Sequence, residues 1–351
     1  MRRILLYLLP LVLLAQLTAC TRPAAESDPE AAEKEVRYVE AMDTFMTLTA
    51  YGSHRSEALD AAEAEIHRLD ALLSVGNPDS EISAVNRTGS GTLSVDTRVM
   101  VEQALALHAE TGGCFDITVL PLMELWGFTS GDHRVPTDAQ LADALSAVGA
   151  NRLDYQSNSG ELALSENQSI DLGGIAKGYT SQRIMELYRA SGVTAGLVSL
   201  GGNVQCLGTR PDGTPWRIGI QDPWGAEGAM VAVVEIVDRA VITSGGYERY
   251  FTNEATGITY HHILDPKTGK PANGGLASVT IVSSDGTLAD GLSTALYIMG
   301  LDAAANYWRS HSGEFEAIFI DHDGKIYVTK GLASSVTPVS SNAELIVLTK
   351  S

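Results

Sequence analysis

The body of the chain interleaves helical and strand patterns, and this alternation limits the architectures that it can adopt. Apolar residues at helical spacing predict four amphipathic helices, over residues 57–73, 96–110, 137–148 and 177–190. Alternating or uniformly apolar segments predict seven strands, over residues 46–51, 196–200, 216–221, 229–237, 277–282, 317–321 and 325–328. Because most of the strand patterns fall in the second half, the sequence favours an α+β fold over a doubly wound parallel sheet.

Length, charge and cysteine content narrow the class further. Residues 36–351 are enough for one large domain or two lobes. The formal net charge is −19 and no cluster of basic residues stands out, which argues against nucleic acid as a partner and against electrostatic adhesion to anionic lipid. Cys114 and Cys206 do not make a disulfide framework in a chain of this length, and the sequence leaves open whether they are bridged.

The N-terminus has the features of an export signal. Two arginines precede an apolar run over residues 4–14, which is too short for a membrane span. The following Leu17-Thr18-Ala19-Cys20 resembles a bacterial lipobox, in which the cysteine thiol is lipidated and becomes the mature N-terminus. The alternative is plain secretion with a chance cysteine at this position.

These features divide the chain into three parts. Residues 1–19 are predicted as a lipoprotein signal peptide, residues 20–35 as the lipidated Cys20 and an acidic tether rich in proline and alanine, and residues 36–351 as the folded domain. A lipid on Cys20 would anchor the mature protein at the extracytoplasmic (periplasmic) face of a cell membrane without spanning it. The choice between inner and outer membrane stays open.

The segment Leu288–Leu296 places a carboxylate and a hydroxyl at the start of an apolar helix. Asp290 and Thr294 are four residues apart, so they share one helix face and aim two oxygen atoms at one point. Oxygen ligands on a rigid helix suit a hard cation such as Mg²⁺. The alternative is an aspartate that stabilises the helix dipole, with Thr294 in the core.

A glycine-rich turn lies before the fourth predicted helix. The segment Asp171–Gly178 reads as a strand end, a tight turn and a helix start, where free N–H groups favour a phosphate. Lys177 adds a positive point charge. The spacing matches neither a Walker loop nor a dinucleotide fingerprint, so a capped helix with a chance lysine is the alternative.

Further glycine-rich turns accompany aromatic residues along the chain. Segments 111–116, 199–203 and 243–247 together suggest a long cleft for a flat, phosphorylated ligand. The pair His261-His262 comes just before an Asp-Pro turn. A lone histidine is usually structural, but in this setting His262 is a catalytic candidate.

Taken in order, these residues resemble the ApbE-type flavin transferases, the family of FAD:protein FMN transferases. The resemblance runs from about Val36 to about Ala304. Its elements are segments 41–44, 77–86, 111–127, 171–178, 199–203, 216–223, 243–251, 262–269 and 289–300. Together and in this order, these segments are far more specific than any single motif. A lipobox is also common in this family.

The resemblance implies a two-lobed α+β fold, in which interleaved lobes of mixed or antiparallel sheet and helices enclose an FAD cleft within a flavin transferase domain over residues 36–351. It implies that FAD is contacted by Met42, Gly113, Cys114, Phe115, Asp171, Lys177 and Leu264. It implies that Mg²⁺ is held by the carbonyl of Gly174 with Asp290 and Thr294, and that His262, Lys177 and Asp290 are catalytic. Cys114 and Gly174 occupy positions where the family more often has alanine.

The implied activity is transfer of FMN from FAD onto a threonine or serine hydroxyl of a partner protein, with release of AMP. If water replaces the hydroxyl, the same site is a Mg²⁺-dependent FAD pyrophosphatase that yields FMN and AMP. A flavin-binding lipoprotein without catalysis is the third hypothesis. By analogy with the family, the acceptor is a membrane electron-transport subunit. The sequence identifies neither the acceptor nor the oligomeric state.

Overall fold

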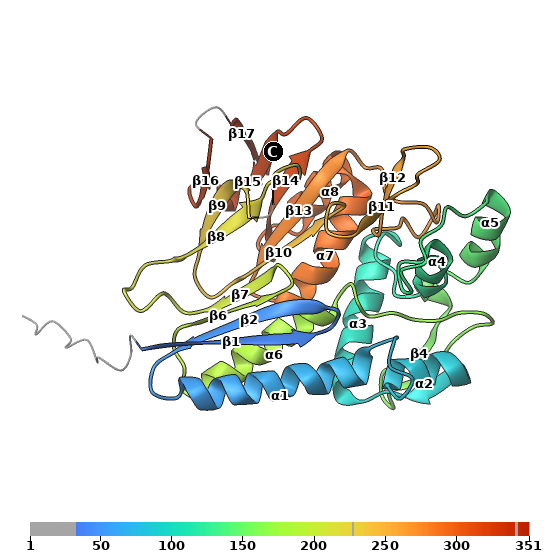
Figure 1. Cartoon of the computed structure of the whole chain (residues 1–351), viewed down its shortest axis with the longest axis horizontal. Helices are drawn as coiled ribbons and strands as arrows, with labels where there is room; N and C mark the ends of the chain where they lie inside the picture. The colour runs from blue at the N-terminus through green and yellow to red at the C-terminus, as the bar shows by residue number, and fades with distance from the viewer. Residues whose placement is uncertain (1–32, 227, 341–342, 351) are drawn as a thin grey trace, which may run out of the picture.

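The protein folds around one large twisted sheet, seen in the computed structural model of Figure 1, which describes residues 33–226, 228–340 and 343–350. The predicted signal peptide, Cys20 and most of the tether lie outside the described residues. The sheet has nine strands in the spatial order β1 (Lys34–Ala41), β2 (Thr44–Tyr51), β6 (Gly196–Leu200), β7 (Asn203–Leu207), β10 (Ala240–Gly245), β13 (Leu276–Ser283), β14 (Glu316–Asp321), β15 (Ile326–Thr329) and β17 (Leu345–Leu348). Neighbouring strands pair antiparallel except β15 with β17, which pair parallel.

Helices cover one face of this sheet. The described helices are α1 (Arg55–Leu73), α2 (Glu81–Thr88), α3 (Val95–Glu110), α4 (Leu120–Trp126), α5 (Asp138–Ser146), α6 (Ala176–Ala190), α7 (Gly286–Met299) and α8 (Leu301–Ser310). Helices α1 and α6 pack on the β1–β7 end of the sheet, whereas α7 packs on β10 and β13. Figure 1 shows α1 along the lower border of the molecule and α4 and α5 at its right. Within the described part of the chain, no helix combines the length and the apolar character needed to cross a bilayer.

Smaller sheets complete the fold. They are β16 (Val336–Pro338), β9 (Met230–Ile236) and β8 (Trp216–Gln221); β3 (Ser90–Thr92), β5 (Glu161–Ala163) and β4 (Asp154–Gln156); and the hairpin of β11 (Tyr250–Thr252) and β12 (Thr259–His261). Residues of β8 and β9 share an apolar cluster with the sheet strands β13 to β15. Strand β13 is consequently covered on both faces, and all eight of its residues are buried, which explains why it carries no charged side chain.

The predicted α+β class is confirmed, and the predicted helices and strands are present with ends that shift by one or two residues. Strand β1 was not predicted, and it begins at Lys34, inside the segment assigned to the tether. Its charged residues occur at both inward-facing and outward-facing positions of the strand, so the alternation of apolar and polar residues is weak. Backbone pairing with β2 from Lys34 to Ala41 makes this segment a strand, although its composition did not predict one.

Helices α6 and α7 approach closely at a pair of glycines, Gly178 and Gly286. A Cβ atom added at Gly178 would lie 2.2 Å from the carbonyl oxygen of Gly286 and 2.5 Å from the Cβ of Asp290. Neither atom belongs to a flexible side-chain end, so the two helices would have to separate. The close crossing therefore requires glycine at this position, which also carries the N–H that meets Asp290.

We expect Gly178→Ala to lower the free energy of unfolding by on the order of 1–3 kcal/mol, the usual range for overpacking a core. Urea denaturation would measure the change. Gly76→Ala is the matched control, because its added Cβ would have Ser74 Oγ at 3.7 Å as its nearest neighbour, an ordinary contact. Equal stabilities of the two variants would contradict the role of the glycine crossing.

Candidate active site

Asp290 lies in the second turn of α7 and is buried. The helix begins at Gly286, where Asp285 is the N-cap and accepts a hydrogen bond from Leu288 N at 3.0 Å. Asp290 therefore does not serve as the cap. Its Oδ2 accepts from Gly178 N at 2.8 Å, and its Oδ1 accepts from Asn203 Nδ2 at 2.9 Å.

The charge of Asp290 is not neutralised by a direct partner. Burial raises the pKa of this carboxyl above its ordinary value, and Lys177, Gly178 N–H and Asn203 counteract the shift. Both hydrogen-bond donors are neutral, and among the described residues no lysine or arginine forms an ion pair with it. A buried carboxylate of this kind retains lone pairs for a cation, so its chemistry fits a metal ligand.

Thr294 lies one turn after Asp290 and faces the end of β10. Its Oγ1 is 3.1 Å from Ser244 Oγ, which is also 2.8 Å from Ser293 Oγ. Ser293 in turn donates to the carbonyl oxygen of Asp290 at 2.8 Å. Thr294 is therefore accompanied by two further hydroxyls that sequence reasoning did not single out, whereas the Asp290 carboxylate bonds to Gly178 and Asn203.

The turn before α6 holds Asp171, Gly174 and Lys177. Asp171 Oδ1 accepts from Gly173 N at 2.8 Å. Burial raises the pKa of Asp171, while the Gly173 N–H, Lys177 and Arg249 act in the opposite direction. A Cβ added at Gly174 would lie 3.2 Å from the Phe115 ring, so this turn packs on a predicted FAD contact.

The three predicted metal ligands are all oxygen atoms, and Asp290 contributes their one carboxylate. Among the described residues, no group of three or more histidine, cysteine, aspartate or glutamate side chains could hold a metal ion. One carboxylate with a hydroxyl and a carbonyl leaves coordination positions for water or substrate phosphate, an arrangement typical of Mg²⁺.

His262 is held with one ring nitrogen engaged and the other available. Its Nδ1 lies 3.1 Å from the carbonyl oxygen of Arg249, and a carbonyl can only accept, so Nδ1 carries the proton. Nε2 is then an unprotonated acceptor. Burial, together with the charges of Arg249 and Lys177, lowers the pKa of His262 to about 4. The imidazole is therefore a neutral base at physiological pH.

The charge of Lys177 influences the pKa of three other candidate residues. It acts on Asp171, on His262 and on Asp290, which come from three distant parts of the sequence. The structure thus brings the three predicted catalytic residues and Asp171 into one region. Arg249 also acts on Asp171 and His262, and it donates to Phe128 O at 2.6 Å. It lies in segment 243–251 of the family resemblance, but the sequence analysis did not single it out.

The structure places the predicted FAD contacts on several loops. Met42 lies in the β1–β2 turn, and Thr180 Oγ1 on α6 donates to its sulfur at 3.7 Å. Phe115 follows the turn after α3, where its ring lies under Gly174 and near Gly291. Leu264 is buried in a separate apolar cluster with Trp126.

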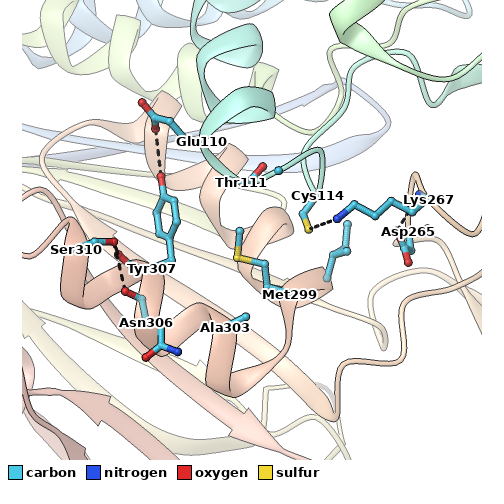
Figure 2. Close-up of a pocket in the computed structure, with 12 residues that line it drawn as sticks. Glu110, Thr111, Cys114, Asp265, Lys267, Met299, Ala303, Asn306, Tyr307 and Ser310 are labelled. Atoms are coloured by element: carbon cyan, nitrogen blue, oxygen red, sulfur yellow. Dashed lines mark hydrogen bonds between the residues drawn. The ribbon is translucent and has the colours of Figure 1, made fainter.

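Cys114 faces a hollow that the catalytic candidates do not line. Figure 2 shows this cavity of about 640 Å³ between the end of α3, the loop at Asp265 and helices α7 and α8. Lys267 Nζ lies 3.9 Å from Cys114 Sγ across it. Asp290, Lys177 and His262 do not line it. Cys114 and Cys206 are both buried free thiols, which answers the question that the sequence left open.

Comparison with known proteins finds relatives over most of the described chain. The model of the ApbE family matches residues 42–319. A Vibrio cholerae protein named FAD:protein FMN transferase is 35% identical over 247 residues, which cover 68% of this chain and 73% of that protein. A Treponema pallidum protein of the same name is 31% identical over 315 residues, 84% of this chain and 86% of that protein.

Solved structures give the same picture. The crystal structure of the ApbE protein from Thermotoga maritima matches with a TM-score of 0.81 at 30% identity, over 86% of this chain and 99% of that chain. The flavin transferase ApbE from Vibrio cholerae matches with a TM-score of 0.76 at 27% identity, over 87% of this chain and 99% of that chain.

The ionisation of His262 can be measured directly. In the ligand-free protein we expect its imidazole resonance to titrate with a midpoint near pH 4, against 6.5 for an ordinary histidine. Because the folded-state pKa is the lower one, the unfolded chain takes up this proton first. Stability therefore falls as the pH falls from about 6.5 to about 4.

The His262→Gln variant identifies the resonance by its disappearance from the NMR spectrum. It should also flatten the decline of stability between pH 6.5 and 4 measured by urea denaturation, because the site of proton uptake is gone. A midpoint at pH 6 or above for His262 would contradict the half-buried, neutral imidazole.

Proposed function

The chain belongs to the ApbE family, and we propose that it is an FAD:protein FMN transferase that moves FMN from FAD onto a hydroxyl of a partner protein. Relatives of that name match most of its length. The observation that carries the proposal is that the charge of Lys177 acts on Asp171, His262 and Asp290, which come from three distant parts of the sequence. A passive flavin carrier has no need for a base beside a buried carboxylate and a lysine.

The acid–base and metal chemistry divides among these residues. We assign Mg²⁺ to Asp290, Thr294 and the carbonyl of Gly174. When bound, Mg²⁺ neutralises negative charge on a pyrophosphate. Lys177 sits at the start of α6, where its ammonium favours phosphate oxygens.

FAD is assigned to the loops that border this centre. Its proposed contacts are Met42, Gly113, Cys114, Phe115, Asp171, Lys177 and Leu264. The packing of Gly174 on Phe115 supports a continuous wall from the metal ligands to the loop after α3. The cavity at Cys114 offers space for a distal part of FAD.

The transfer itself needs one bond made and one broken. The acceptor hydroxyl oxygen forms a bond to the phosphorus of the FMN half. The bond from that phosphorus to the bridging oxygen breaks, and AMP leaves with this oxygen. The hydroxyl proton passes to Nε2 of His262, which is unprotonated because Nδ1 is engaged by Arg249 O.

The reaction is tested by incubating the purified protein with FAD, Mg²⁺ and candidate acceptor domains. Transfer is expected to increase the acceptor mass by FMN minus water and to make its denatured band fluoresce. Formation of AMP with every acceptor unmodified would instead indicate the FAD pyrophosphatase. If FAD binds and neither product forms, the protein is a non-catalytic flavin-binding lipoprotein.

We expect Asp290→Asn to reduce transfer at least about 100-fold, because losing roughly 3 kcal/mol of charge stabilisation has that effect on rate. FAD affinity should fall less, since the loop contacts remain. Asp285→Asn on the same helix is the control. Asparagine caps a helix as well as aspartate does, so this variant should retain activity. Equal rates for Asp290→Asn and wild type at saturating Mg²⁺ would exclude this metal site.

We further propose that Cys20 is lipidated and holds the enzyme at the extracytoplasmic face of a membrane. The acceptor would then be a membrane electron-transport subunit that the tethered domain meets in the same plane. Confinement to one membrane raises the effective concentration of the acceptor, so tight binding is unnecessary.

Cys20→Ser should move the protein from the membrane fraction to the soluble fraction, because the acylated thiol is lost. Transfer measured with a soluble acceptor should be unchanged, since the folded domain is intact. Fractionation and immunoblotting measure the first effect. A Cys20→Ser protein that stays in the membrane fraction would contradict lipid anchoring at this residue.

A further inference from the structure

Two exposed aromatic side chains lie together beside the candidate active site. Tyr38 on β1 and Phe45 on β2 are 77% and 78% exposed. Tyr38 pairs with Thr47 and Phe45 pairs with Glu40, so the two rings are diagonal neighbours on one face of the sheet. Phe45 is the only exposed one of the six phenylalanines, all of which the structure describes. This pair is therefore an apolar surface that the fold itself does not use.

The backbone beside these rings is also unpaired. Strand β1 is an edge of the nine-stranded sheet, and in residues 33–226, 228–340 and 343–350 no strand pairs with its outer side. A two-residue turn joins Ala41 to Thr44, so Ala41 and alternate residues before it bond to β2. The remaining residues direct their N–H and C=O groups outward; they are Lys34, Val36, Tyr38 and Glu40. Such an edge is a template for an added strand.

The same hairpin leads into the candidate active site. The carbonyl oxygen of Phe45 accepts a hydrogen bond from Gly201 N at 3.2 Å. Asn203, two residues further on, donates to the Asp290 carboxylate at 2.9 Å. The turn residues 42–43 contact helix α6 through Met42. A chain lying along β1 towards its turn would therefore end at the segment that contacts α6.

We propose that the β1 edge and the Tyr38–Phe45 pair form the docking surface for the acceptor protein. An extended segment of the acceptor adds to the sheet beside β1 and delivers its hydroxyl residue at the β1–β2 turn. This proposal rests on the proposed transferase function, which requires a polypeptide as second substrate.

The charges along the edge define the chemistry of that segment. Lys34 lies at the far end of β1 and Glu40 next to the turn, and both are exposed. These positions are about 20 Å apart in an extended strand. Complementarity calls for an acidic side chain near Lys34, a basic one near Glu40 and an apolar one over the aromatic pair.

A second copy of the chain fits this edge less well. Helix α1 packs under β1 and is acidic overall, with five acidic residues and two arginines. Pairing two β1 edges would place two such helices of like charge side by side, which is unfavourable. The acceptor segment avoids this repulsion.

The test places a photoreactive benzoylphenylalanine at position 38 or 45 of the full-length protein, in cells that contain a flavinylated acceptor. Position 224 is the control, because Trp224 is 56% exposed and its ring faces Gly324 at the β14–β15 turn. Flavin fluorescence in a denaturing gel marks the acceptor by its covalent FMN. We expect at least about tenfold more fluorescent crosslinked product from positions 38 and 45 than from 224.

Kinetics provide a second readout. Phe45→Ala and Tyr38→Pro, which removes an outward N–H, should each slow labelling about tenfold at low acceptor concentration. FAD affinity should change less than twofold, and Trp224→Ala should label normally. Crosslinking to a second copy, or equal product from all three positions, would overturn the docking surface. If the wild-type protein labels no polypeptide, the transferase function itself fails and the docking surface falls with it.

Discussion

The buried carboxylate of Asp290 joins three separate parts of the chain, and the candidate active site depends on this junction. One oxygen accepts the N–H of Gly178 on α6, and the other accepts the amide of Asn203 at the β6–β7 turn. Removing the carboxylate would leave both buried donors unpaired. Only glycine at 178 permits the close helix approach that makes the first bond. The close packing of α6 on α7 and the position of the Asp290 carboxylate therefore depend on each other.

The candidate active site carries positive charges, whereas the whole molecule is strongly negative. The chain carries a net charge of −19, yet Lys177 and Arg249 both act on the buried groups at the site. A local positive field allows an anionic dinucleotide to approach an acidic protein. Burial keeps His262 neutral, and the same field adds to this effect because the protonated imidazole would be a third cation among them. One set of charges thus favours both phosphate binding and a free base.

Local patterns predicted the long helices and the more apolar strands, but not β7 and β10 in the middle of the large sheet. The family resemblance, and not a local pattern, supplied most of the FAD contacts, and contacts between distant segments were invisible to both. The spacing of Asp290 and Thr294 defines one helix face whatever the tertiary structure. In contrast, the Asn203–Asp290 bond spans 87 residues and the Ser244–Thr294 contact spans 50. The contact of Arg249 with His262 was not predicted, because it is made by the backbone carbonyl, which any residue could supply. Strand β1 escaped notice because pairing, not alternation, defines it.

The β1–β2 turn ties the edge strand to the site under conformational strain. Met42 and Asp43 have φ values of 50° and 56°, a region that costs a non-glycine residue about 1–2 kcal/mol. Asparagine and glycine would relieve this strain. They would also remove the thioether that contacts Thr180 and the carboxylate whose charge acts on Asp171. The strained sequence therefore exchanges some hairpin stability for side chains that reach α6 and the catalytic turn.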